Sequence, residues 1–442
     1  MKKNTNTRCA YTKRLMCSIS LFLIIISNGA TAQSDYENVL IDKQLNAFEY
    51  PPCEPSICIS PNDPSKIVAG AILKQVYVSA DSGKTWAEQN LQSKLGVYGD
   101  PCVIANNAGD FYYFHLGDPS GMGWGNDGFL ECIVSHRSTE HGANWTGGSA
   151  IGRNAPKDQD KEWAVATHDS KKIFCTWTQF DKYESTTPTD SSNIMFSCTN
   201  RKAKKWKRSK RINQLAGNCA DNDSTVEGAV PAAGPDGEIY VAWALNETIY
   251  FDRSTDGGKH WLEQDIAAAH IPGGWAQDIG GIMRCNGMPV LVCDNSNGPN
   301  RGTLYICWSD TTNSAADVDI WISSSKDKGN TWSKAVRVND DAAGKQQFLP
   351  WLAIDQTNGN LYIVFYDRRN HEGNMTDVYL ASSTDGGLNW LNERISHKPF
   401  TPQSDVFFGD YNNISAHNGV VRPIWTRLEN GQLSVWTALI SK

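Results

Sequence analysis

The stretch STDGGKHW at residues 254–261 recurs as STDGGLNW at residues 383–390, and this eight-residue pattern decides the fold. The form Ser-x-Asp-x-Gly-x-x-Trp occurs intact four times, at residues 79–86, 254–261, 325–332 and 383–390, and in altered form at 138–145 and 199–206. Its Ser and Asp can bind nearby backbone N–H groups, its Gly permits a left-handed backbone, and its Trp can pack the turn onto a core. A turn that recurs in this way marks a repeated structural unit.

Alternating apolar and polar runs precede each copy of the turn. The segment GPDGEIYVAWALNETIYFDRSTDGG at 234–258 is representative, with β-branched and aromatic residues bounded by Gly and Asn. This period of two predicts antiparallel strands, and no segment shows a long helical period. A four-stranded sheet repeated about every 60 residues is typical of a β-propeller blade.

The number of first strands gives the number of blades. They are expected to start near Glu54, Asp100, Glu162, Glu227, Asn286, Gln347 and Asp410. The last unit has only three strands, and the segment YENVLIDKQ at 36–44 resembles the fourth strands of other units. The sequence therefore predicts an all-β, seven-bladed propeller whose ring is closed by the N-terminal strand, with six blades as the alternative.

The N-terminus has the pattern of a secretory signal peptide. Basic residues in positions 2–14 precede the apolar run SISLFLIIIS at 18–27 and the small residues ATA at 30–32. We expect residues 1–32 to be removed and residues 33–442 to form a single secreted domain. Loss of five basic residues takes the formal net charge from −7 to about −12. Such a protein is a poor general nucleic-acid ligand, and we expect a monomer with neither nucleic acid nor membrane as partner.

Two side chains stand out as candidates for proton transfer. The second strands of five units end on an aromatic residue, Trp177, Trp243, Trp308, Phe365 or Trp425, but DFYYFH ends on His115. This strand end is expected to open on the mouth of the ring, where an imidazole could act as acid or base; the alternative is a packing residue. Tyr183 follows the same strand of the next unit and could share that work, or be an ordinary loop residue.

The segment RKAKKWKRSKR at 201–211 holds eight basic residues in eleven. It could receive an anionic polymer, with an arginine that pairs with a carboxylate, or it could be a solvated edge strand guarded by lysines. Arg201, Arg211 and Arg153 are the candidates for binding substrate.

Two further clusters could hold a cation. Glu54, Asp100, Glu162, Glu227 and Asp410 are predicted to surround the mouth, where they could bind a cation, supply carboxylate pairs for hydrolysis, or only hydrogen-bond the strand starts. A second set could form a structural zinc site or, alternatively, a disulfide and a free thiol: Cys219, His270, Cys285 and Cys293. Ten cysteines remain after residue 32, and disulfides are expected in an exported protein, with Cys53–Cys58, Cys102–Cys132 and Cys175–Cys198 as conceivable pairs.

The recurring turns resemble the Asp-box repeats of the sialidase superfamily over essentially all of residues 33–442. The resemblance implies a propeller. A sialidase also needs three arginines, a Tyr/Glu nucleophile pair and an acid/base Asp, and the early Arg-Ile-Pro segment of that family is absent here.

The chain also resembles the seven-bladed ulvan lyases, which use two His, a Tyr and an Arg in that order. His115, His136, Tyr183 and Arg201 occur in this order with comparable separations. The resemblance implies β-elimination on a uronate-containing anionic polysaccharide, with no cofactor for the chemistry and zinc or calcium only as structural ions. Strand register would carry His136 and Arg201 toward the face opposite His115, so Arg211 and Arg153 are substitutes for Arg201. A sialidase-type hydrolase and a non-catalytic glycan-binding propeller are the alternative functions.

Overall fold

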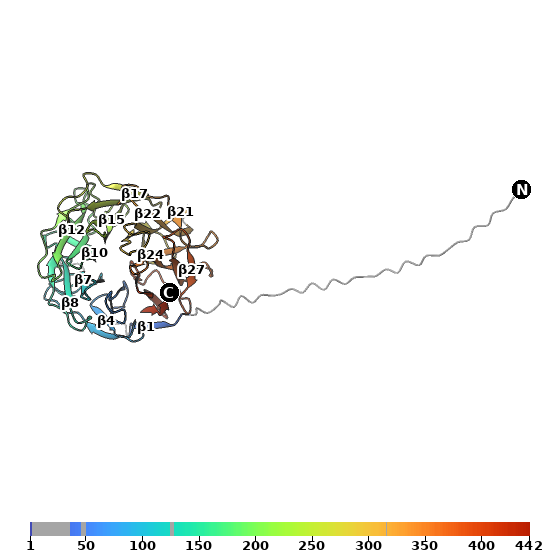
Figure 1. Ribbon diagram of the computed structural model, residues 1–442, viewed down its shortest axis with the longest axis horizontal. Helices are drawn as coiled ribbons and strands as arrows, with labels where there is room; N and C mark the ends of the chain where they lie inside the picture. Colours follow the sequence, from blue (N-terminus) through green and yellow to red (C-terminus); the bar gives the residue numbers. More distant parts are fainter. Residues whose placement is uncertain (2–35, 46–49, 124–127, 315) are drawn as a thin grey trace. The chain divides into compact units, whose positions relative to one another are not determined.

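The computed structural model describes Met1 and residues 36–45, 50–123, 128–314 and 316–442. The predicted signal peptide lies outside the described residues. Within the unit Gln33–Lys442, six four-stranded antiparallel sheets and one five-stranded sheet follow one another around a central axis, and the described residues contain no helix (Figure 1). The prediction of an all-β, seven-bladed propeller is confirmed.

Each blade places its strands in chain order from the axis outward. The innermost strands are β2 (Ser56–Ile59), β6 (Cys102–Ala105), β10 (Asp158–Ala166), β14 (Glu227–Ala233), β20 (Val290–Cys293), β24 (Gln347–Asp355) and β28 (Asn413–His417). The second strands are β3 (Ile67–Ala71), β7 (Phe111–Leu116), β11 (Lys172–Phe180), β15 (Ile239–Leu245), β21 (Leu304–Ser314), β25 (Asn360–Asp367) and β29 (Val420–Glu429).

The two outer positions complete each sheet. The third strands are β4 (Gln75–Ser79), β8 (Ile133–Ser138), β12 (Ser192–Asn200), β16 (Thr248–Ser254), β22 (Asp317–Ser325), β26 (Asp377–Ser383) and β30 (Gln432–Ala438). The outermost are β5 (Ala87–Asn90), β9 (Ser149–Ile151), β13 (Lys210–Arg211), β17 (Ile266–His270), β23 (Val336–Arg337), β27 (Leu391–Arg394) and β1 (Asn38–Lys43). The short pair β18 (Ala276–Gln277) and β19 (Cys285–Asn286) follows the fourth blade and precedes the fifth along the chain, and β31 (Ile440–Ser441) pairs with β29.

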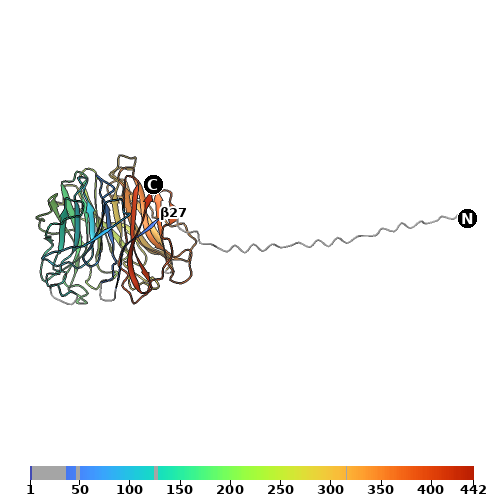
Figure 2. The same cartoon turned by 90° about the horizontal axis from the view of Figure 1, so that it is seen from below.

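The ring is closed by the N-terminal strand, as the sequence predicts. β1 pairs antiparallel with β30, from Asn38 opposite Ala438 to Lys43 opposite Ser434. The last blade therefore takes three strands from the C-terminus and one from the N-terminus. Figure 2 shows the blades from the side, with the strands running across the thickness of the ring.

The recurring turns form the hydrogen bonds that their residues predict. In the first, Ser79 Oγ accepts a bond from the Gly83 N–H at 2.8 Å, and Asp81 Oδ1 accepts bonds from two further backbone N–H groups at 3.0 and 2.9 Å. Ala203 takes the left-handed backbone (φ 52°) in the altered turn of the third blade, where the intact pattern has Gly. These turns follow the third strands and lie at one face of the ring. The innermost strands start at the opposite face, which we call the mouth.

Candidate functional site

The mouth is lined by residues that a left-handed backbone turns toward the axis. Glu54 (φ 51°), Asp100 (φ 50°) and Lys161 (φ 52°) stand just before or within the first residues of their innermost strands. In β10 the pairing with β11 slips between Asp160 and Trp163, as a β-bulge does. Bulges and left-handed non-glycine residues re-aim side chains and gather at functional sites. The mouth is therefore the first place to look for function.

A buried lysine holds the carboxylates of three blades together. Lys161 Nζ donates to Asp410 Oδ2 and lies 3.7 Å from Asp100 Oδ2 and 4.0 Å from Glu54 Oε1, with only 7% of its side chain exposed. The surrounding carboxylates raise the pKa of Lys161 well above its usual value, although burial opposes this, so the ammonium stays charged. Three members of the predicted acidic ring thus bind a protein cation.

A second cation joins this cluster to Tyr183. Arg284 donates from Nε to Asp410 Oδ1 at 2.8 Å and from Nη2 to Asp410 Oδ2 at 2.5 Å, and its Nη1 lies 3.6 Å from Asp221 Oδ2. The Tyr183 hydroxyl donates to the same Asp221 oxygen at 2.9 Å. Arg284 keeps 43% of its side chain exposed, so this end of the chain of contacts faces solvent. Tyr183 therefore lies at the mouth, as the sequence predicts.

Burial raises the pKa of Tyr183, with the carboxylates of Asp160 and Asp221 adding to the effect. The hydroxyl is therefore protonated in the resting protein, and Asp221 accepts its hydrogen bond. For Arg284 the neighbouring Asp410 raises the pKa further, which keeps the guanidinium charged. The arrangement joins a tyrosine–carboxylate hydrogen bond to an exposed, permanent positive charge.

Two carboxyl groups of the acidic ring are buried without a partner. Glu162 and Glu227 are each 1% exposed, and neither carboxyl oxygen of either residue has a hydrogen-bond partner among the described residues. Burial raises both pKa values well above the usual value, with Asp100 adding to the shift of Glu162 and Asp221 to that of Glu227. Burial therefore favours the neutral acid form of both groups.

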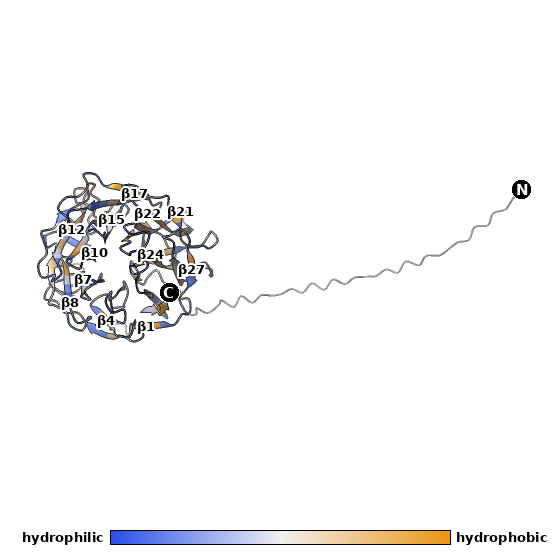
Figure 3. Cartoon of the chain, in the orientation of Figure 1, coloured by the Kyte–Doolittle hydropathy of each residue, from blue (hydrophilic) through white to orange (hydrophobic). Residues whose placement is uncertain are grey.

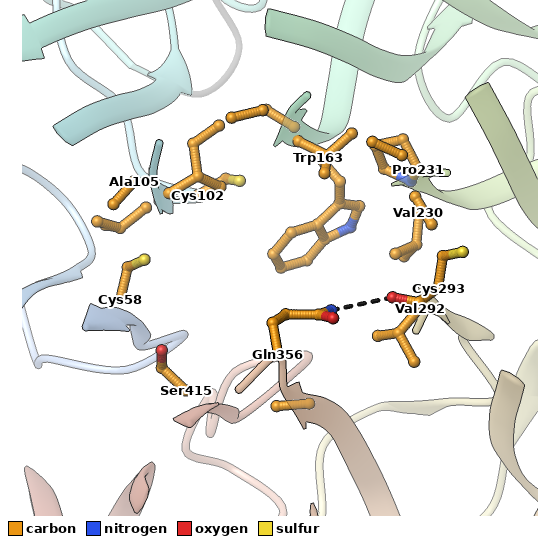
Figure 4. Close-up of a pocket in the computed structure, with 18 of the residues that line it drawn as sticks. Cys58, Cys102, Ala105, Trp163, Val230, Pro231, Val292, Cys293, Gln356 and Ser415 are labelled. Atoms are coloured by element: carbon orange, nitrogen blue, oxygen red, sulfur yellow. Dashed lines mark hydrogen bonds between the residues drawn. The ribbon is translucent and has the colours of Figure 1, made fainter. Parts of the chain in front are cut away.

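Three aromatic rings lie beside this charged cluster. Trp163 packs against Trp351 of the sixth blade with ring centroids 4.3 Å apart, and against Tyr411 of the seventh blade at 5.0 Å. Further along the axis is a cavity of about 480 Å³ lined by all seven innermost strands. Figure 4 shows Trp163 in this cavity with Cys58, Cys102, Val230 and Val292 around it. The rings therefore stand between a charged mouth and a largely apolar channel.

His115 and His136 are brought together, but inside a blade. Their Nε2 atoms are 3.0 Å apart, and both residues are 0% exposed. His115 occupies the same buried environment as Trp243 and Trp308 in other blades, so the expectation that this position opens on the mouth is wrong. The concern that strand register separates the two His residues is wrong as well, because His136 lies diagonally across from His115 on the neighbouring strand.

The His115–His136 pair is one proton short of satisfying its contacts. Each Nδ1 lies near a backbone carbonyl, at 2.7 Å from Leu116 O and 2.6 Å from Thr146 O, so both Nδ1 atoms need a proton. The contact between the Nε2 atoms needs a third proton, whereas two neutral imidazoles carry only two protons on their ring nitrogens. Burial, and then His136, lowers the pKa of His115 to about 3, which opposes taking up the third proton. A catalytic role for either residue stays a prediction.

The arginine candidates are each held by other residues of the chain. Arg201 is in the turn at the face opposite the mouth, where it binds Asp110 through Nε and, at 3.1 Å, through Nη2. Arg211 donates to the carbonyls of Asn213 and Gln214 at 2.8 Å each, and Arg153 pairs with Glu131 at 2.6 Å. The structure places Tyr183 and Arg201 at opposite faces of the ring, because the turn after a third strand cannot reach the start of a first strand.

The predicted zinc ligands are not assembled. Among the described residues no group of three or more His, Cys, Asp or Glu is arranged to hold a metal ion. His270 is exposed and contacts the Glu247 carbonyl at 2.7 Å, whereas Cys285 in β19 and Cys293 in β20 are buried. The backbone of Cys219 forms an isolated antiparallel β-bridge with that of Ser185. The four residues belong to different parts of the ring.

The expectation of disulfides is also wrong, since all ten cysteines of the described residues are free. Cys175 is opposite Ser197, and Cys198 is opposite Phe174, so the two thiols point to different faces of one sheet. Cys102 is in β6, and Cys132 immediately precedes β8, with β7 between them. Two strand spacings of about 4.8 Å exceed the Cα separation that a disulfide can bridge.

Sequence reasoning missed Lys161, Asp221 and Arg284. Lys161 directly precedes Glu162, where the sequence predicts that the strand starts, so its position was visible, but the direction of its side chain depends on the bulge. Arg284 belongs to the segment around β18 and β19, which has no counterpart in the repeat. A search for charged residues where the repeat is interrupted could have found it.

No family model and no curated protein matches the sequence. Solved structures match at low identity. A protein of unknown function from Dyadobacter fermentans DSM 18053 is 13% identical, covers 92% of this chain and 98% of its own, and has a TM-score of 0.50. The Hadza microbial sialidase Hz136 is 13% identical over 85% of this chain and 73% of its own, with a TM-score of 0.47. The NanB sialidase from Streptococcus pneumoniae is 10% identical over 85% and 83%, with a TM-score of 0.48. The first of these similarities shows a shared fold.

Proposed function

We propose that this protein is a secreted polysaccharide lyase that cleaves a uronate-containing, ulvan-type polymer by β-elimination at the mouth of the propeller. The observation that carries the proposal is the continuous set of contacts Tyr183–Asp221–Arg284 at the mouth, with the hydroxyl of Tyr183 2.9 Å from Asp221 and the guanidinium 3.6 Å from the same carboxylate. It supplies a proton-transfer group and a cation, which are the two requirements of this reaction.

The elimination can be written with these residues alone. Tyr183 passes its hydroxyl proton to Asp221, and the phenolate removes the proton from C5 of the uronate. The C4=C5 double bond forms as the C4–O4 bond breaks, and Tyr183 delivers the C5 proton to the leaving O4. Asp221 then returns its proton to Tyr183. The raised pKa of Tyr183 makes its phenolate a strong base once formed.

Arg284 neutralises the substrate carboxylate in this scheme and so makes the C5 proton easier to remove. Its Nε and Nη2 atoms are held by Asp410, whereas Nη1 is beyond hydrogen-bond distance of Asp221 and keeps donors for a ligand. Lys161 and Asp410 orient the guanidinium from the buried side.

A sialidase-type glycoside hydrolase is the second candidate, favoured by the same Tyr183–Asp221 hydrogen bond. There the tyrosine would attack the anomeric carbon while Asp221 accepts its proton. The proposal as a lyase is preferred because the sialidase resemblance implies three arginines that bind the substrate. Arg284 is the exposed arginine of this cluster, whereas Arg368, which contacts Gly280 near the mouth, is 3% exposed.

The test is incubation of the mature protein with ulvan and other uronate polysaccharides. A lyase product has a C4–C5 double bond conjugated to its carboxylate and absorbs in the ultraviolet, whereas a hydrolase gives new reducing ends without that absorbance. Tyr183→Phe should reduce turnover by about 10²–10⁴-fold with the fold intact. Tyr250→Phe, a half-buried tyrosine on the third strand of the fourth blade, is the matched control. Normal turnover in Tyr183→Phe would place the active centre elsewhere.

A further inference from the structure

The strongest unassigned feature is a basic surface on the third blade, at the face opposite the mouth. It consists of Lys202, Lys204, Lys205, Lys207 and Arg208, which are all exposed and follow the end of β12. No carboxylate of the described residues lies within 4.0 Å of the charged nitrogens of these five side chains, whereas Arg201 is neutralised by Asp110. The basic surface therefore carries about five unneutralised positive charges on a protein with a negative formal net charge.

The backbone beneath the basic surface is fixed. Thr199 Oγ1 donates to the Lys205 carbonyl at 2.7 Å, Ser197 Oγ donates to the Lys207 carbonyl at 2.6 Å, and the Lys207 N–H donates to Cys198 O at 2.9 Å. Trp206 turns inward, where its Nε1 donates to Ser135 Oγ at 2.8 Å. The lysines on either side of Trp206 are thus presented from an ordered strip, which lowers the entropic cost of binding a ligand.

Protection of a sheet edge does not account for this density of charge. The other outer strands read NVLIDK in β1, AEQN in β5, SAI in β9, IAAAH in β17, VR in β23 and LNER in β27, and together they hold three Lys or Arg residues. Figure 3 shows β17 in orange, at the hydrophobic end of the scale. Each of these edge strands holds at most one Lys or Arg, whereas the strip 201–211 of the third blade holds eight.

A surface hollow of about 590 Å³ adjoins the basic surface between the second and third blades. Its lining includes Asn107, His168, Lys171, Asn200 and Lys202, which offer amide, imidazole and ammonium donors. Its one carboxylate, Asp169, is paired with Lys171 at 3.0 Å. Such a lining suits a hydroxylated, negatively charged sugar.

We infer that the basic surface is a second binding site, for an extended sulfated polysaccharide, separate from the mouth. Sulfate esters supply the charge, and the hollow accommodates a sugar unit. The strip 201–211 has no exposed aromatic ring on which a nucleic-acid base could stack, because its one aromatic residue, Trp206, is packed inside. It also has no exposed large apolar side chain to enter a membrane.

The experiment measures binding of the mature protein to dextran sulfate, with neutral dextran as the uncharged probe, between about 50 and 200 mM NaCl. We expect binding to dextran sulfate alone, with an affinity that falls steeply as salt rises. The variant K204Q/K205Q/K207Q/R208Q should bind about 30-fold more weakly and with a shallower salt dependence. The variant K84Q/K94Q/K326Q/K334Q removes the same charge from exposed lysines of the first and fifth blades and should bind like wild type.

Equal loss in the two quadruple variants, both folded by thermal denaturation, would overturn the inference and leave only an effect of net charge. It would also be overturned if wild type failed to bind dextran sulfate at 50 mM NaCl. Tighter binding of single-stranded DNA or of phosphatidylserine vesicles, lost in the first variant, would assign the basic surface to a nucleic acid or a membrane instead. Tyr183→Phe should bind dextran sulfate normally, so the outcome does not depend on the proposed lyase activity.

Discussion

Replacement of Lys161 by Met tests whether one buried ammonium holds the mouth together. In wild type this side chain contacts Asp410, Asp100 at 3.7 Å and Glu54 at 4.0 Å, and it is 7% exposed. Met has similar length and removes the charge alone. Asp410 would keep Arg284, but Asp100 and Glu54 would face each other without the ammonium.

The expected cost is about 3–5 kcal/mol, the range for removing one partner of a buried ion pair. A domain of roughly 400 residues unfolds with an entropy of about 0.8 kcal/mol/K, so the midpoint temperature should fall by about 4–6 °C at pH 7. Lys171→Met is the control, because Lys171 pairs with Asp169 at 3.0 Å but is 79% exposed. An exposed pair contributes about 0–1 kcal/mol, so its midpoint should change by about 1 °C or less.

The deficit of Lys161→Met should also shrink in acid. Lys161, and then Arg284, lower the pKa of Asp410 despite its burial. A depressed carboxyl pKa contributes stability above the unfolded value of 3.8, and that contribution disappears as pH falls toward the folded value. Differential scanning calorimetry at pH 7 and at pH 3, which lies below the unfolded pKa of 3.8, measures both effects. A midpoint within 1 °C of wild type at pH 7, or a deficit that grows in acid, would refute the reasoning.

Three further substitutions test buried or turn residues. Glu227→Gln should be at least as stable as wild type above pH 4.5, and its advantage should grow with pH. The reason is that burial raises the pKa of Glu227, so that its deprotonation opposes folding. Urea titrations at pH 5 and pH 8 check this, and a variant less stable than wild type at pH 8 would contradict it. His115→Phe should match wild type at pH 7 and exceed it at pH 5. Because the pKa of His115 is lowered, wild type loses up to about 1.4 kcal/mol of folding stability per pH unit as pH falls from 6.5 toward about 3. A stable variant whose turnover falls 100-fold would instead support the catalytic prediction. Asp327→Ala should lower the urea midpoint, because Asp327 accepts the Thr331 N–H at 2.9 Å and the Ser325 hydroxyl at 2.8 Å; Glu140→Ala, at the same position of an altered turn, should lower it less in the same titration.

The sequence by itself determined the repeat, the blade number and the closure of the ring. These follow from local rules: the turn Ser254–Trp261 specifies its own hydrogen bonds, and a period of two specifies a strand wherever it occurs. The three-stranded last unit left one place open, and the segment at 36–44 had the pattern to fill it. Tyr183 could be placed at the mouth because the end at which a second strand finishes follows from counting strands.

Only the tertiary structure decided which charged residues meet. Lys161 reaches Asp410, 249 residues away, because two blades face each other across the axis, and a bulge rather than a sequence pattern aims its side chain. His115 could not be distinguished from a mouth residue in the sequence, since burial at that position depends on the neighbouring blade. The cysteines remained unpaired for the same reason: strand alternation and the intervening β7 separate thiols that lie close in the chain. Local patterns repeat and can be read from one blade, whereas contacts across the ring depend on the packing of all seven.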